Sequence, residues 1–205
     1  MIGRRPVAYF SSSYLKEDTV ARIPQATRDS VPEAQRAVFD ALVQQRGNVP
    51  SDGPLAIMIN VPEMLQRGEH LRAYLRGDAS RLSLKIRELA MILTARELDC
   101  QFIWNAHAGL ARKAGIRDDI VDRLRAQQEL TDLAPDEAAV VSYGREFFRT
   151  HRVSQATFDA ALAQFGVQGL VELTNLMGYY ALLAFNINAF GVGLPAAISE
   201  APLPI

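Results

Sequence analysis

Three side chains between residues 88 and 107 have the types and the spacing needed for proton-transfer or thiol chemistry. They are a carboxylate, a thiol and an imidazole: Glu88, Cys100 and His107. An imidazole exchanges protons near neutral pH, a carboxylate can orient it, and a thiolate is a nucleophile. The stretch therefore predicts either general acid–base catalysis by Glu88 and His107 or nucleophilic chemistry at Cys100.

The spacing of Cys100 and His107 predicts that they share one face of a helix, two turns apart. Two turns are about 10 Å of rise, so water or substrate would have to bridge the two side chains. Asp99 is expected to cap this helix, with Cys100 in its first turn, where the helix dipole favours a thiolate. The charge of Asp99 opposes that effect. Glu88 is expected on a neighbouring helix, from which it would orient the imidazole.

Each of these residues also has a purely structural interpretation. A single cysteine on an apolar helix face is commonly a small buried hydrophobe. A lone histidine is often a core or surface residue, and Glu88 could pair on a solvated helix face. The basic side chains near it in sequence are Lys85, Arg87 and Arg96.

Other aromatic and histidine residues are expected to have structural roles. Trp104 and the pair Tyr179 and Tyr180 are predicted to be core or pocket-wall residues. His70 and His151 stand in polar surroundings near predicted helix ends, so we expect both to face solvent.

The elements that must position the candidate residues are helices. Apolar residues recur at helical spacing, Ser83 is a candidate N-cap, and glycines mark helix ends. No run alternates as a strand would. The helices are expected near residues 32–46, 62–75, 84–98, 100–113, 118–128, 135–148, 154–165 and 170–190.

This pattern predicts an all-α fold, a helical bundle in a single domain. We divide the chain into an irregular N-terminal arm (1–31), a helical domain (32–195) and a proline-rich C-terminal tail (196–205). Residues 48–62 are expected to form a loop with a short apolar run. One of the two termini is expected to pack on a neighbouring subunit.

Composition excludes several classes of protein. The chain has 22 basic and 23 acidic residues, a net charge of −1, which does not suit a nucleic-acid-binding surface. We expect no signal peptide and no membrane span, because the apolar stretch 170–190 includes four polar residues: Glu172, Asn175, Asn186 and Asn188. A single cysteine rules out an intramolecular disulfide and suits a reducing compartment, so the cytoplasm is expected.

Several common catalytic motifs are missing. The sequence has no histidine pair at metal-ligand spacing, no glycine-rich phosphate loop and no Gly-x-Ser-x-Gly elbow. We therefore expect neither a metal nor a cofactor.

Residues 87–115 resemble the core motif of the carboxymuconolactone decarboxylase and alkylhydroperoxidase D superfamily. In alkylhydroperoxidase D a glutamate precedes Cys-x-x-Cys and a histidine, and Glu88, Cys100 and His107 match the glutamate, the first cysteine and the histidine. Ile103 replaces the second cysteine. The order Phe102, Trp104, His107 is similar to the decarboxylase-like branch, and residues 171–192 resemble the family's last long helix. The likeness covers roughly residues 33–195.

The resemblance implies Glu88, Cys100 and His107 as catalytic residues in a substrate pocket formed by Phe102, Ile103 and Trp104. It also implies a homo-oligomer, often trimer-based, that acts on a small molecule.

Three functions stay open at this stage. The first is Glu/His acid–base chemistry on a small organic acid or lactone, either decarboxylation or ring opening in aromatic catabolism. The second is a one-cysteine thiol peroxidase of antioxidant type, in which Cys100 would need an external thiol reductant because Ile103 cannot resolve a sulfenic acid. The third is a non-catalytic oligomeric binding protein. The aromatic residues before His107 favour the first.

Overall fold

The computed structural model describes residues 19, 20, 22–195 and 197–205 and confirms a predominantly helical fold. Its helices are α1 (Arg36–Arg46), α2 (Gly53–Met58), α3 (Pro62–Arg76), α4 (Leu84–Glu97), α5 (Gln101–Lys113), α6 (Asp118–Arg125), α7 (Pro135–Thr150) and α8 (Gln155–Phe190). A 3₁₀ turn, Glu33–Gln35, precedes α1. The boundaries follow the predicted N-caps and glycine stops closely.

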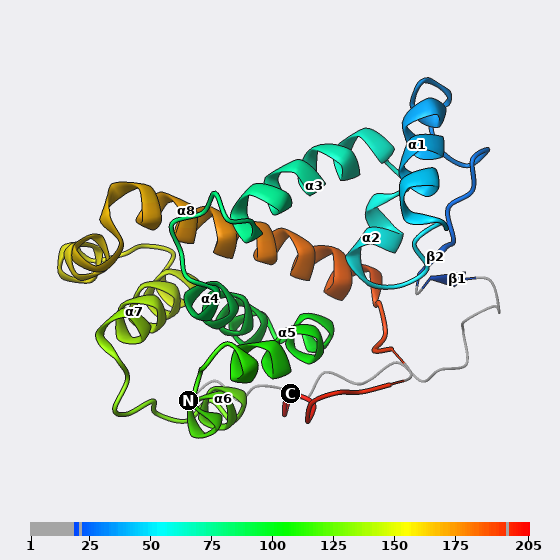
Figure 1. The fold of residues 1–205 in the computed structure, drawn as a ribbon. Coiled ribbons are helices and arrows are strands. Elements are labelled where there is room, and N and C mark those ends of the chain that lie inside the picture. Colours follow the sequence, from blue (N-terminus) through cyan, green and yellow to red (C-terminus); the bar gives the residue numbers. More distant parts are fainter. Residues whose placement is uncertain (1–18, 21, 196) are drawn as a thin grey trace.

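Helix α4 is the centre of the bundle and packs against α5, α7 and α8 (Figure 1). It begins at Ser83, whose hydroxyl accepts a hydrogen bond from the Ile86 amide. Every residue from Ile86 to Arg96 is buried. A helix that is covered all round belongs in a core, so any polar side chain on α4 must find its partner inside the protein.

Helix α8 runs between α1–α3 on one side and α4 and α7 on the other (Figure 1). Ser154 caps it, and the backbone leaves the helical region at Gly166 (φ 63°, ψ 179°), as the predicted break between two helices requires. The second part resumes directly after Gly166 and runs to Phe190. Gly191, in the left-handed region, ends the helix.

Among the described residues, α8 is the one helix long and apolar enough to cross a membrane by length and composition. However, 56% of its most apolar window is buried within the fold. The Glu172 carboxylate also accepts hydrogen bonds there from the Tyr74 hydroxyl and the Arg81 amide. These contacts support the interpretation of α8 as a core helix of the bundle.

Two segments contain structure that the sequence did not predict. Thr19–Val20 (β1) and Ile23–Pro24 (β2) form a short antiparallel pair within the predicted irregular arm. The loop predicted over residues 48–62 contains α2, which begins after Asp52 with Pro54 in its first turn. Two residues per strand, and six in α2, are too few to show a periodic pattern. The rest of the arm, residues 1–18, lies outside the described residues.

The C-terminal tail packs on its own chain. Leu203 is buried in the core. Its amide donates to the Gln101 side chain (2.8 Å), whose amide nitrogen donates back to the Leu203 carbonyl (2.8 Å). The tail therefore lies fixed along the start of α5.

Candidate functional site

The turn between α4 and α5 determines how these two helices, which carry the candidate residues, lie against each other. Asp99 adopts the left-handed region (φ 50°), which aspartate tolerates better than most residues. The Cys100 amide donates to the Ala95 carbonyl (2.8 Å), and Cys100 is the N-cap of α5. The prediction that Asp99 is the cap and that Cys100 lies in the first turn is therefore wrong by one residue.

The chain brings Glu88 and His107 together across this α4–α5 pair. His107 Nδ1 lies 2.8 Å from Glu88 Oε2, and both side chains are more than nine-tenths buried. On the other side of the ring, the Tyr180 hydroxyl from α8 lies 3.3 Å from Nε2, and the two rings meet edge to face. When Glu88 is ionised it accepts the Nδ1 proton, which leaves the Nε2 lone pair to accept from Tyr180. The three side chains thus form a connected proton path.

This path ends at a cavity of about 330 Å³ that opens to solvent. His107 and Tyr180 belong to its wall, together with apolar side chains that include Phe102, Ile103 and Leu183. Two of the predicted pocket residues, Phe102 and Ile103, therefore line the cavity. The third, Trp104, is fully buried away from it and donates its indole N–H to the Ala201 carbonyl (3.1 Å).

Charged side chains line the other side of the cavity. Glu69 accepts hydrogen bonds from Arg46 (2.6 Å) and from Arg72 (2.8 and 3.0 Å). The bonds between Arg72 and Glu69 raise the pKa of Arg72, although burial opposes the shift. Arg76 points its Nη2 atom to within 3.9 Å of Glu88 Oε1. Burial raises the pKa of Tyr180 well above its usual value, so the hydroxyl keeps its proton and can donate it in a hydrogen bond.

Cys100 lies apart from this arrangement. It is fully buried and does not line the cavity. Burial raises the pKa of its thiol to about 11, and the backbone amides of Ile103 and Phe102 offset only part of that effect. The helix start therefore does not lower the thiol pKa overall, because desolvation outweighs the stabilisation by the amides.

The structure also decides between the alternatives for Glu88. Its basic neighbours in sequence have other partners: Lys85 pairs with Glu137 (3.0 Å), Arg96 with Asp99 (2.7 Å), and Arg87 donates to the carbonyls of Arg76 and Gly77. The interpretation of Glu88 as part of a solvated ion pair is therefore wrong. His70 and His151 are exposed, as predicted. Within the described residues no three His, Cys, Asp or Glu side chains converge as a metal site would require.

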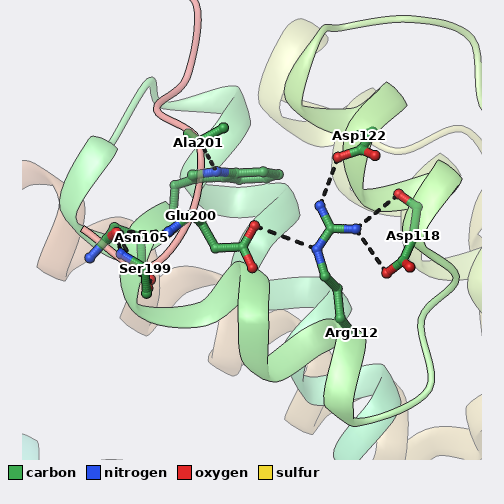
Figure 2. Close-up of polar contacts among 8 residues, drawn as sticks. Asn105, Arg112, Asp118, Asp122, Ser199, Glu200 and Ala201 are labelled. Atoms are coloured by element: carbon green, nitrogen blue, oxygen red, sulfur yellow. Dashed lines mark hydrogen bonds and ion pairs between the residues drawn. The ribbon is translucent and has the colours of Figure 1, made fainter. Parts of the chain in front are cut away.

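The C-terminal tail fixes α5 from the side opposite the cavity, through the contacts in Figure 2. The side-chain oxygen of Asn105 accepts a hydrogen bond from the Ser199 amide (2.9 Å), and the backbone carbonyl of Asn105 accepts one from the Ser199 hydroxyl (2.9 Å). Glu200 approaches Arg112 (3.4 Å). Arg112 also binds two carboxylates of α6: Asp118 (2.9 Å) and Asp122 (2.7 Å). We call residues 199–205 the strap.

Sequence reasoning predicted Tyr180 as a core or pocket-wall residue but not as a partner of His107, and it did not single out Arg76. Tyr180 is 73 residues from His107, and its sequence neighbours show only an apolar helix. Arg76 ends α3 as many surface arginines end helices. Only the packing of α3 and α8 beside α5 places them at His107.

Comparison with known proteins agrees with this geometry. Residues 62–146 match the Carboxymuconolactone decarboxylase family, a range that contains both Glu88 and His107. No protein of curated function matches the sequence.

Solved structures with the same fold include two peroxidase-related proteins. One is the alkylhydroperoxidase AhpD core protein from Ralstonia eutropha JMP134, with 17% identity over 87% of this chain and 94% of that one and a TM-score of 0.65. The other is a peroxidase-related protein from Silicibacter sp. TM1040, with 17% identity over 91% and 96% and the same TM-score. The debrominase Bmp8, in complex with 2,3,4-tribromopyrrole, matches with 14% identity over 86% and 91% and a TM-score of 0.61. At these identities the likeness shows the fold alone.

Two findings bear on the class of protein. Residues 62–146 match the model of the Carboxymuconolactone decarboxylase family, and the fold is similar to that of alkylhydroperoxidase D-like proteins. The chain has one cysteine, Cys100, and Ile103 lies three residues after it.

Proposed function

We propose that the chain is an enzyme that uses Glu88, His107 and Tyr180 for acid–base chemistry on a small organic acid or lactone. The observation that carries the proposal is the buried hydrogen-bonded path from Glu88 through His107 to Tyr180, which ends at a cavity. Buried polar groups at a cavity wall, joined in this way, are the usual arrangement of a general acid–base pair.

In this proposal His107 Nε2 exchanges a proton with the substrate. Glu88 holds the ring in one tautomer and stabilises the imidazolium formed when Nε2 takes up a proton. The Tyr180 hydroxyl, which keeps its proton because of burial, donates a hydrogen bond to the oxygen on which negative charge develops. Both groups face the same cavity, so a substrate of a few non-hydrogen atoms can reach them together.

For decarboxylation, the bond from the substrate carbon to its carboxylate breaks and carbon dioxide leaves. The electron pair stays on the substrate and needs an unsaturated carbonyl or lactone as its sink. His107, protonated from solvent, then donates a proton to carbon. Ring opening of a lactone by water uses the same groups. His107 takes a proton from the attacking water, the ring C–O bond breaks, and the imidazolium gives its proton to the leaving oxygen.

The thiol peroxidase alternative has less support from the site. A peroxidatic cysteine must meet peroxide as a thiolate. Cys100 is fully buried, its pKa is raised to about 11, and it lies outside the cavity.

The test is turnover of a panel of unsaturated carboxylic acids and carboxylated lactones in D₂O. NMR follows deuterium incorporation at carbon, and carbon dioxide release is measured in parallel. We expect activity with at least one compound, a fall of about 10³-fold in His107→Gln, and retention within about threefold in Cys100→Ser. Near-wild-type turnover by His107→Gln would refute the assignment. Binding of panel members without turnover by the wild-type protein would support a binding protein instead.

A further inference from the structure

Arg76 differs from the other arginines at the cavity in the contacts that its guanidinium makes. The side chain of Arg76 is one-third exposed, lines the cavity with His107, and donates no hydrogen bond within the part of the chain that the structure describes. Its one ion-pair partner there is Glu88, whose Oε1 atom lies 3.9 Å from Arg76 Nη2. That separation is longer than a hydrogen bond. The donors of the guanidinium are therefore available to a ligand.

The neighbouring arginines already donate hydrogen bonds to other groups of the protein. Glu69 holds Arg46 through one nitrogen and Arg72 through two, at 2.6 to 3.0 Å. The Nη1 atom of Arg87 donates hydrogen bonds to the carbonyls of Arg76 and Gly77 at the end of α3. Of these arginines, Arg76 alone combines a place on the cavity wall with a guanidinium that donates no hydrogen bond to the described residues.

The end of α3 would ordinarily repel an anion, because the last carbonyls of a helix carry partial negative charge. Here the Arg87 guanidinium caps the carbonyls of Arg76 and Gly77, the second at 2.9 Å. Its positive charge offsets the negative end of α3 at the residue that carries the Arg76 side chain. The same contact fixes the backbone of Arg76 relative to α4, one residue before Glu88.

We propose that Arg76 is the anion-binding residue of this cavity and that it binds a carboxylate of the ligand beside His107. The inference rests on the proposed function, since it names the substrate class for the same site. Guanidinium is suited to this role because its parallel N–H donors match the two oxygens of a carboxylate. Arg87 acts as a positioning residue, since it contacts the α3 backbone and does not line the cavity.

The experiment compares an acid with its neutral analogue of the same shape. Benzoate and benzamide are titrated by NMR into the wild-type protein, Arg76→Gln and Arg67→Gln. Arg67 is the matched control, because it lies on the same helix, pairs with Glu63 on the surface and carries the same charge. We expect the wild-type protein and Arg67→Gln to bind benzoate about tenfold more tightly than benzamide. In Arg76→Gln the two should bind within about twofold.

Two outcomes would overturn the proposal. One is an undiminished preference for benzoate in Arg76→Gln, and the other is no preference, or no binding of either probe, in the wild-type protein. Arg76→Lys keeps the charge and should retain part of the preference. Melting temperatures check that each variant is folded, and Arg76→Met replaces Arg76→Gln if the latter does not fold.

These measurements involve no turnover, so they separate the two proposals. A carboxylate preference that depends on Arg76 would stand even if no compound were converted. Conversely, conversion that depends on His107 but shows no preference for acids would leave the proposed function intact and remove Arg76 from it.

Discussion

The strongest test of the site is the replacement of Glu88 by glutamine, which keeps the shape of the side chain and removes its charge. The carboxylate lies 2.8 Å from His107 Nδ1 and is 2% exposed, so solvent screens the pair weakly. With charge centres about 4 Å apart and an effective dielectric constant of about 20, the ion pair formed when His107 is protonated is worth about 4 kcal/mol. The glutamine oxygen still accepts the Nδ1 proton and recovers part of this.

We therefore expect Glu88→Gln to raise the barrier by about 3 kcal/mol and to lower kcat/KM by about 10²-fold. The assay is the deuterium incorporation described above, with any panel compound that the wild-type protein converts. Glu137→Gln is the matched control, because Glu137 is also a buried glutamate in an ion pair, with Lys85, but lies outside the cavity. A fall of less than about threefold in Glu88→Gln would mean that His107 is not protonated in the rate-limiting step. An equal fall in Glu137→Gln would show that general destabilisation causes the loss.

Three further predictions concern stability and assembly. The thiol pKa of Cys100 is raised by burial, so its contribution to stability is present below the unfolded-state pKa and is lost as pH rises towards about 11. Denaturant titrations should therefore show the unfolding free energy of the wild-type protein falling by about 2 to 3 kcal/mol relative to Cys100→Ala between pH 9 and 11; parallel curves would contradict the argument. Glu172→Ala should cost about 3 kcal/mol in the same assay, because the carboxylate accepts four hydrogen bonds, and a loss below about 1 kcal/mol would mean that water replaces them. The exposed apolar face of α8, with Phe185 at 69% exposure, leads us to expect a homo-oligomer that Phe185→Glu weakens; equal sedimentation of both proteins would remove this face from the interface.

The course of the helices was largely predictable from the sequence, because local signals set it. Ser83 and Ser154 cap helices, and Gly47, Gly166 and Gly191 adopt positive φ where helices end or break. The strand pair β1–β2 and the six-residue α2 were missed. Elements this short gain their stability from the surfaces on which they pack.

The candidate site was predictable only in part. The spacing of Glu88 and His107 was enough to expect that two adjacent helices would bring them together, which the structure shows. The state of Cys100 depends on how completely other segments bury it, and the sequence did not show that burial would raise its pKa. Tyr180 and Arg76 come from distant segments, so their positions follow from tertiary packing alone.

The strap has a consequence for the order in which the protein is completed during synthesis. Trp104, Asn105 and Gln101 of α5 bind the backbone of residues 199–203, which lie 94 to 102 residues later in the sequence. While the ribosome is still translating these codons, the strap side of α5 has no cover and Leu203 cannot fill its place in the core. Domains otherwise fold progressively as they emerge. In this protein the helix that carries His107 reaches its final environment only after the strap has been made.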